Sequence, residues 1–89
     1  MVTHEDVRKF LESYLTQRLK AQGRELPADF SEDCDLYLSG LLDSLGIVEL
    51  TAALSTYHGR QIDFEELDPE NLAVVGPLCR FVSEQLSKT

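Results

Sequence analysis

The residues best placed to do chemistry are Asp43 and Ser44, which stand at the start of a predicted helix. A side chain in the first turn of a helix is exposed, and the backbone N–H groups beside it have no acceptor within the helix. Aspartate is a common helix cap, so Asp43 is expected to cap this helix and to fix the direction of the serine. On its own the pair predicts a plain helix start with an exposed serine hydroxyl.

The cysteines and histidines form weaker patterns. Cys34 and Cys79 are far apart in sequence, and neither lies at zinc-site spacing from His4 or His58. A catalytic pair of Cys79 with His58, or of Cys34 with His4, is formally possible. Cys79, however, lies among the apolar residues of the last predicted helix. We therefore expect a buried, reduced thiol at each cysteine.

One acidic segment, Asp33-Cys34-Asp35, begins like a calcium-binding loop. Such a loop needs an oxygen ligand and a turn glycine at the positions of Tyr37 and Leu38, and a glutamate at the position of Ser44. All three requirements fail, so no metal site is predicted.

The spacing of apolar residues predicts a first helix well before Asp43 and Ser44. From about Thr3 to Gln22, six apolar residues share one face of a helix, namely Val7, Phe10, Leu11, Tyr14, Leu15 and Leu19. Thr3 with Asp6 forms a capping-box pattern at its start, and Gly23 can end it. Residues 24–42 lose this spacing and read as a long loop, which apolar side chains would hold to the core: Leu26, Phe30, Leu36, Leu38 and Leu41.

The second helix is expected to begin at Asp43-Ser44 and to end near His58, with Gly59 as its stop signal. Three of its apolar residues are expected to face inward: Leu50, Leu54 and Tyr57. Three others form a separate apolar stripe, either extra core or a surface that docks a partner: Leu45, Val48 and Ala52.

Two further helix starts follow. Asp68-Pro69 predicts a short helix through about Leu72, and Gly76-Pro77 predicts a last helix to about Leu86. The expected fold is all-α, a small four-helix up-and-down bundle with a long first loop and a short third helix. The 89 residues would form one domain, residues 1–89, and a monomer is expected.

The charge balance limits the classes of partner. With 16 acidic and 8 basic residues the net charge is -8, which disfavours nucleic acids and anionic membranes as partners. The charge indicates either partners with basic patches or solubility alone. No apolar run approaches the roughly 20 residues of a membrane span. The first residues do not read as a secretory signal, so we expect a cytoplasmic protein.

The run from Ser39 to Leu50, Ser-Gly-Leu-Leu-Asp-Ser-Leu-Gly-Ile-Val-Glu-Leu, resembles the attachment site of acyl carrier and peptidyl carrier proteins. Their shared pattern is a glycine, an Asp-Ser-Leu triplet, and a hydrophobic-Glu-Leu further along the helix. The stretch from Phe64 to Leu72, followed by Val74-Val75, resembles the third helix of the family and the entry to its fourth. The resemblance covers most of residues 36–82.

This resemblance implies that Ser44 carries a 4'-phosphopantetheine arm, which a magnesium-dependent phosphopantetheinyl transferase moves from coenzyme A. The arm ends in a thiol and would hold an acyl or aminoacyl group as a thioester. The protein would not itself be an enzyme, because a loading ligase or acyltransferase and downstream biosynthetic enzymes supply the catalysis. Leu45, Val48 and Ala52 would then dock these partners, and Glu49 matches a glutamate that partners contact in this family.

The chain also departs from the fatty-acid synthase carriers, which bear several acids along the second helix. Its acids are concentrated instead in residues 29–35 and 63–70. If the fold brings both segments near Ser44, they would form a negative rim around it; otherwise they only keep a small protein soluble. The runs from Gly40 to Leu45 and from Asp68 to Asn71 look more like those of free-standing carriers of amino acids or unusual acyl units. The alternative is an acidic helical adaptor that binds other proteins without a prosthetic group.

Overall fold

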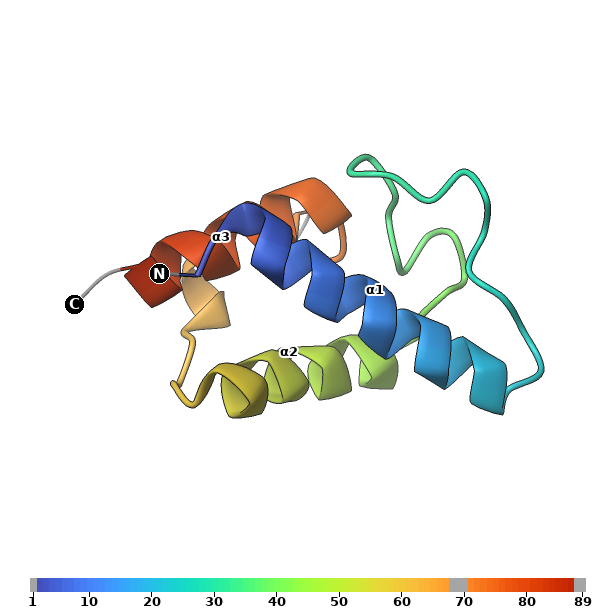
Figure 1. Ribbon diagram of the computed structural model, residues 1–89, viewed down its shortest axis with the longest axis horizontal. Helices are drawn as coiled ribbons and strands as arrows, with labels where there is room; N and C mark the ends of the chain where they lie inside the picture. The colour runs from blue at the N-terminus through green and yellow to red at the C-terminus, as the bar shows by residue number, and fades with distance from the viewer. Residues whose placement is uncertain (1, 68–70, 88–89) are drawn as a thin grey trace.

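The structure is a computed structural model, and it describes residues 2–67 and 71–87. These residues form three α-helices, α1 (His4–Ala21), α2 (Ser44–His58) and α3 (Val75–Ser87), with a 3-10 turn, η1 (Phe64–Glu66), between α2 and α3. α2 runs back in the opposite direction to α1 (Figure 1). Within the described ranges the only β-type pairing is an isolated antiparallel bridge between Asp35 and Val74.

The expectation of an all-helical protein is confirmed for these residues. A fourth α-helix is not among the elements they form. The start predicted for the short third helix, Asp68-Pro69, lies outside the described residues. None of the helices in the two described ranges is long and apolar enough to cross a membrane.

The start of α1 follows the sequence signal closely. The Asp6 N–H donates to Thr3 Oγ1 at 3.1 Å, and the Thr3 N–H donates to Asp6 Oδ2 at 3.0 Å, which completes a capping box. Hydrogen bonding to the carboxyl by Thr3, first through its backbone N–H and then through its hydroxyl, lowers the pKa of Asp6. At the other end Gly23 has a φ of +71°, a left-handed conformation that favours glycine.

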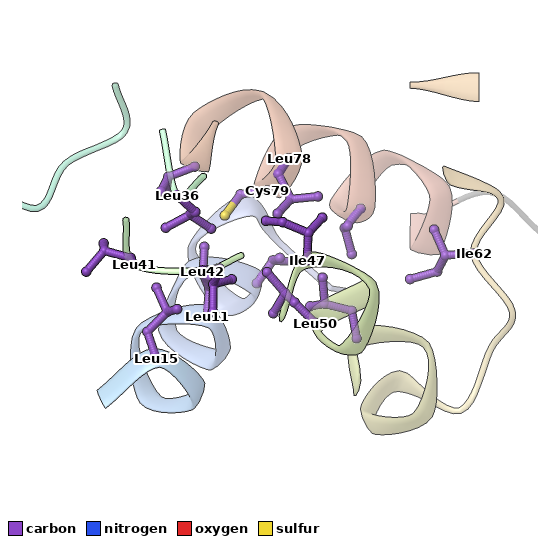
Figure 2. Packing of buried hydrophobic residues seen from close by; sticks show 14 of the residues in the cluster. Leu11, Leu15, Leu36, Leu41, Leu42, Ile47, Leu50, Ile62, Leu78 and Cys79 are labelled. Carbon is purple, nitrogen blue, oxygen red and sulfur yellow. The ribbon is translucent and has the colours of Figure 1, made fainter. Parts of the chain in front are cut away.

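The core lies between the three helices and the segment before α2 (Figure 2). Four residues of α1 are completely buried at helical spacing: Val7, Leu11, Leu15 and Leu19. α3 packs against α1 through its own apolar face. Phe10 is only partly buried, and Tyr57 is exposed rather than inward-facing as predicted. Its ring stacks on Phe10 at the surface, with centroids 4.4 Å apart.

Residues 22–43 join α1 to α2 through a series of turns. Leu36, Leu41 and Leu42 are buried and hold this segment to the core, and Leu26 and Phe30 pack against it in part. Leu38 was expected to do the same, but it is 80% exposed.

The start of α3 is built from backbone groups of this joining segment. The Val75 N–H donates to Cys34 O at 3.0 Å, and the Gly76 N–H donates to Glu32 O at 2.8 Å. Pro77 has no backbone N–H. The two bonds therefore satisfy the N–H groups of the first helical turn that have no acceptor within the helix. The helix therefore begins at Val75, one residue before the predicted Gly76.

Glu32 also ties this junction to α1. Its carboxylate accepts a hydrogen bond from Arg8 Nη1 at 2.7 Å and contacts His4 Nε2 at 2.5 Å. A Cβ atom on Gly76 would lie 3.1 Å from Glu32 O, a tighter contact than usual, so glycine suits the close approach of the two backbones. The Glu32 junction thus links α1, the joining segment and α3.

Candidate functional site

Ser44 is the first residue of α2, and its side chain is exposed. Asp43 caps the helix as predicted: its backbone is extended, and its Oδ1 accepts the Gly46 N–H at 2.6 Å. The Ser44 and Leu45 N–H groups belong to the first turn and therefore have no acceptor within the helix. The serine hydroxyl thus stands in solvent at the positive end of the α2 dipole.

Gly46 allows this cap to form. It is buried, and a Cβ atom there would lie 3.1 Å from Asp43 Oδ1 and 3.2 Å from Leu42 Cβ. Leu42 belongs to the core, so the missing side chain lets the start of α2 pack tightly against it. Leu42 and the Asp43 cap together fix the direction in which the helix presents Ser44.

An open groove of about 490 Å³ lies beside Ser44. Apart from Ser44, it is lined by Asp35, Tyr37, Leu38, Ile47, Val48, Leu72 and Ala73. These residues come from three places in the chain: the joining segment, the start of α2, and the residues before α3. The fold thus places a mainly apolar groove beside Ser44, the serine at the predicted helix start.

Asp35 shapes one wall of this groove. Its Oδ1 accepts the N–H groups of both Tyr37 and Leu38, each at 2.9 Å, which makes a tight turn. This turn explains why Leu38 stays out of the core. The sequence placed Asp35 near Ser44 only as part of the acidic segment of residues 29–35, and it did not assign Tyr37, Ile47, Leu72 or Ala73 to the site. For Tyr37 a signal was available, because an aspartate two residues earlier commonly forms a turn.

The apolar stripe of α2 is on the surface. Leu45 is 64% exposed and Val48 is 62% exposed, and Ala52 is exposed as well. Of the two readings left open by the sequence, extra core is therefore wrong. Leu45 and Val48 extend the apolar surface of the groove along α2.

Glu49 lies on α2 but is held by α1. Arg18 Nη1 donates to Glu49 Oε2 at 3.1 Å, and this hydrogen bond raises the pKa of the arginine. Arg18 therefore partly compensates the negative charge of Glu49 in the free protein. A partner that contacts Glu49 would meet this ion pair.

The two acidic segments do not form one rim around Ser44. Asp35 of the first segment lines the groove. The second segment lies at the far end of α2, where the Ile62 N–H donates to Ser55 Oγ and Gln85 Nε2 donates to Glu66 Oε2. The 15 residues of α2 span about 22 Å at 1.5 Å per residue. The expected contribution of residues 63–67 to the rim is thus wrong, and residues 68–70 lie outside the described residues.

The other chemistry-bearing residues form no competing site. Cys79 is completely buried, and burial raises the pKa of its thiol to about 12, as expected of a core thiol. Cys34 is partly buried, and both cysteines are free. No group of three metal-binding side chains occurs within residues 2–67 and 71–87.

A second groove, of about 620 Å³, lies between α1 and the end of α2. Its lining includes Phe10, Tyr14, Tyr57 and His58. His58 Nε2 is buried and has no hydrogen-bond partner among the described residues, and burial lowers the pKa of this imidazole. The length of α2 separates this groove from Ser44.

No protein-family model, curated protein or solved structure matches the chain. What the protein does must therefore be inferred from its own residues. Ser44, the Asp43 cap and the groove of about 490 Å³ carry that inference.

Proposed function

We propose that the chain is a carrier protein, which holds an acyl or aminoacyl group as a thioester on a 4'-phosphopantetheine arm at Ser44. The observation that carries the proposal is an exposed serine at a capped helix start, beside a mainly apolar groove. The surrounding run from Ser39 to Leu50 resembles the attachment site of acyl and peptidyl carrier proteins. The carrier would present its cargo to successive enzymes of a biosynthetic pathway.

The residues around Ser44 fit the proposed group. Its phosphodiester is anionic, and the N–H groups of Ser44 and Leu45 at the start of α2 favour a negative charge. The first turn of α2 contains no acidic residue that would repel it. The Asp43 carboxylate just before it is engaged by the Gly46 N–H. When bound, the arm supplies a terminal thiol that can form a thioester.

The exposed stripe of Leu45, Val48 and Ala52 supports a surface for partner enzymes, with Glu49 at its edge. The partners would be a phosphopantetheinyl transferase, a loading ligase or acyltransferase, and downstream enzymes. Because such partners catalyse the reactions, the chain itself would not be an enzyme.

The proposal also assigns the finer architecture. A carrier of this type is a single domain, here residues 1–89, built as a four-helix up-and-down bundle with a long first loop and a short third helix. The three described α-helices are compatible with that plan. A monomer in the cytoplasm fits the free cysteines, since reduced thiols are usual there.

Intact-mass measurement tests the proposal directly. The purified chain is incubated with coenzyme A, magnesium and a phosphopantetheinyl transferase of broad specificity. We expect the mass to rise by one arm in the parent and not at all in Ser44→Ala. Ser39→Ala, which removes an exposed hydroxyl five residues away, is the matched control and should gain the full mass. An unchanged parent, or a full gain in Ser44→Ala, would refute the assignment.

An adaptor without a prosthetic group is the second candidate, and one observation favours it. Tyr37, Leu38, Leu45 and Val48 leave large apolar surfaces exposed in the unmodified chain. An adaptor would bind its partner equally well as the parent and as Ser44→Ala. A carrier would need its arm for transfer, so the same variant separates the two functions.

A further inference from the structure

We propose that the groove beside Ser44 selects a cargo with a positively charged amine, and that the carboxylate of Asp35 makes this selection. The inference rests on the proposed carrier function and names the class of group carried. It arises from the composition of the groove, in which one acid stands among apolar and hydroxyl side chains.

Among the described residues that line the groove, only Asp35 is charged. The other lining residues are Tyr37, Leu38, Ser44, Ile47, Val48, Leu72 and Ala73, none of which is ionised at neutral pH. None of the ion pairs between described residues includes Asp35. The protein thus leaves this charge for a group that enters the groove.

Asp35 is also held in place. Its backbone pairs with Val74, and its carbonyl accepts the Ser39 N–H at 2.9 Å. The N–H groups of Tyr37 and Leu38 both bind Oδ1, and no donor from the described residues binds Oδ2. A carboxylate has acceptor sites on both oxygens, so a fixed and available oxygen remains.

Selection would come from the contrast between two kinds of cargo. The apolar part of either cargo can cover Ile47 and Leu72. An ammonium group would in addition meet the Asp35 carboxylate. A neutral acyl group of the same size would cover that carboxylate without pairing it, which is unfavourable. Specificity is the difference between the affinities of the groove for the two cargoes. The unpaired Asp35 carboxylate lowers the affinity for the neutral cargo.

A matched pair of cargoes on the intact chain tests the inference. Ser44 receives either a 3-aminopropanoyl or a butanoyl group on the arm, each through a stable amide in place of the thioester. The two cargoes are close in size and differ in the terminal ammonium. Backbone amide shifts of Tyr37, Leu38 and Ala73 then report how much of the cargo lies in the groove.

In the parent we expect larger shifts with the amine cargo than with the neutral cargo. Asp35→Asn should remove this difference and lower the ratio of groove-bound to free amine cargo about fivefold, the upper range for a partly exposed ion pair. Asparagine keeps the Oδ1 acceptor, so the turn at Tyr37 and Leu38 is retained. The control is Asp33→Asn, an exposed acid outside the groove, which should behave as the parent.

The outcomes separate this inference from the carrier function. If both cargoes attach to Ser44 and give equal shifts in the parent and in Asp35→Asn, the selection is refuted and the carrier function stands. Stronger shifts with the neutral cargo refute the selection as well. If Ser44 accepts no arm, the carrier function fails and the cargo assignment fails with it.

Discussion

The starts of α2 and α3 satisfy their backbone N–H groups in two different ways. Both must satisfy backbone N–H groups that have no acceptor inside the helix. At α2 the neighbouring side chain of Asp43 serves one of them, and Ser44 stays exposed. At α3 two carbonyls from the joining segment, those of Glu32 and Cys34, cover the helix start and bury it.

The difference shows why only one of these helix starts is a candidate site. A start capped by its own neighbour leaves donors and an adjacent side chain accessible to a ligand or an enzyme. A start capped by a distant segment has no room for either, and it serves to hold the fold together. The following predictions test this contrast, beginning with the largest effect.

The glycines of the two starts should respond differently to alanine. Gly76→Ala places Cβ 3.1 Å from the backbone oxygen of Glu32, which is pinned by its own hydrogen bond. We expect a loss of about 2 kcal/mol in the free energy of unfolding, within the usual range for overpacking. Urea denaturation measures it.

Gly46→Ala is the companion variant. Its Cβ would lie 3.1 Å from Asp43 Oδ1 and 3.2 Å from Leu42 Cβ, which are side-chain rather than backbone atoms, and alanine recovers up to about 1 kcal/mol of helix propensity. Its loss should therefore be the smaller of the two. Equal losses would mean that the α3 start is no more rigid than the α2 start.

Removing the local cap should weaken α2 without disturbing the rest of the protein. Asp43→Ala deletes the acceptor of the Gly46 N–H, and helix caps of this type contribute about 1 kcal/mol. We also expect slower attachment of the arm to Ser44, because the first turn frays. Asp43→Asn preserves the acceptor and is the control. Unchanged thermal stability in Asp43→Ala would contradict the role of the cap.

A charge on the exposed stripe should affect partners and leave stability nearly unchanged. Val48 is 62% exposed, so Val48→Asp is expected to cost no more than about 0.5 kcal/mol. Its rate of loading by a partner enzyme should fall. Thr56→Asp adds the same charge near the other end of α2 and should load normally. Equal loading rates for the two variants would exclude Val48 from the partner surface.

The smallest effect is expected at the distant acidic segment. Glu65 and Glu66 follow the C-terminal end of α2, a helix about 22 Å long, and salt screens charges separated by more than about 8 to 10 Å. Reversing both to lysine should leave the loading rate at physiological salt unchanged. A clear decrease would show that partners reach along the whole of α2.

The sequence predicted best those features that depend on near neighbours. The Thr3 and Asp6 capping box, the Asp43 cap and the stop at Gly59 all involve groups a few positions apart, and the structure confirms them. The position of Ser44 on the surface follows from the same local rule.

Features built from distant segments were missed. The start of α3 at Val75 depends on carbonyls of the joining segment, which no local pattern reveals. The inward positions expected for Leu38 and Tyr57 were wrong, because a turn at Asp35 and a stack on Phe10 hold them at the surface. Leu72 lines the groove because of the tertiary fold. Its distance in sequence from Ser44 gave no indication that the two residues would share a groove.

The Glu32 junction also has a consequence for the order of folding. α2 can form its first turn with groups that are adjacent in the chain, so its nucleation requires no long loop to close. The first turn of α3 needs Glu32 O and Cys34 O, and bringing such distant groups together has an entropic cost that grows with the intervening length. Contacts of this range form late in folding. The amides of Val75 and Gly76 should therefore gain protection from hydrogen exchange after those of α2.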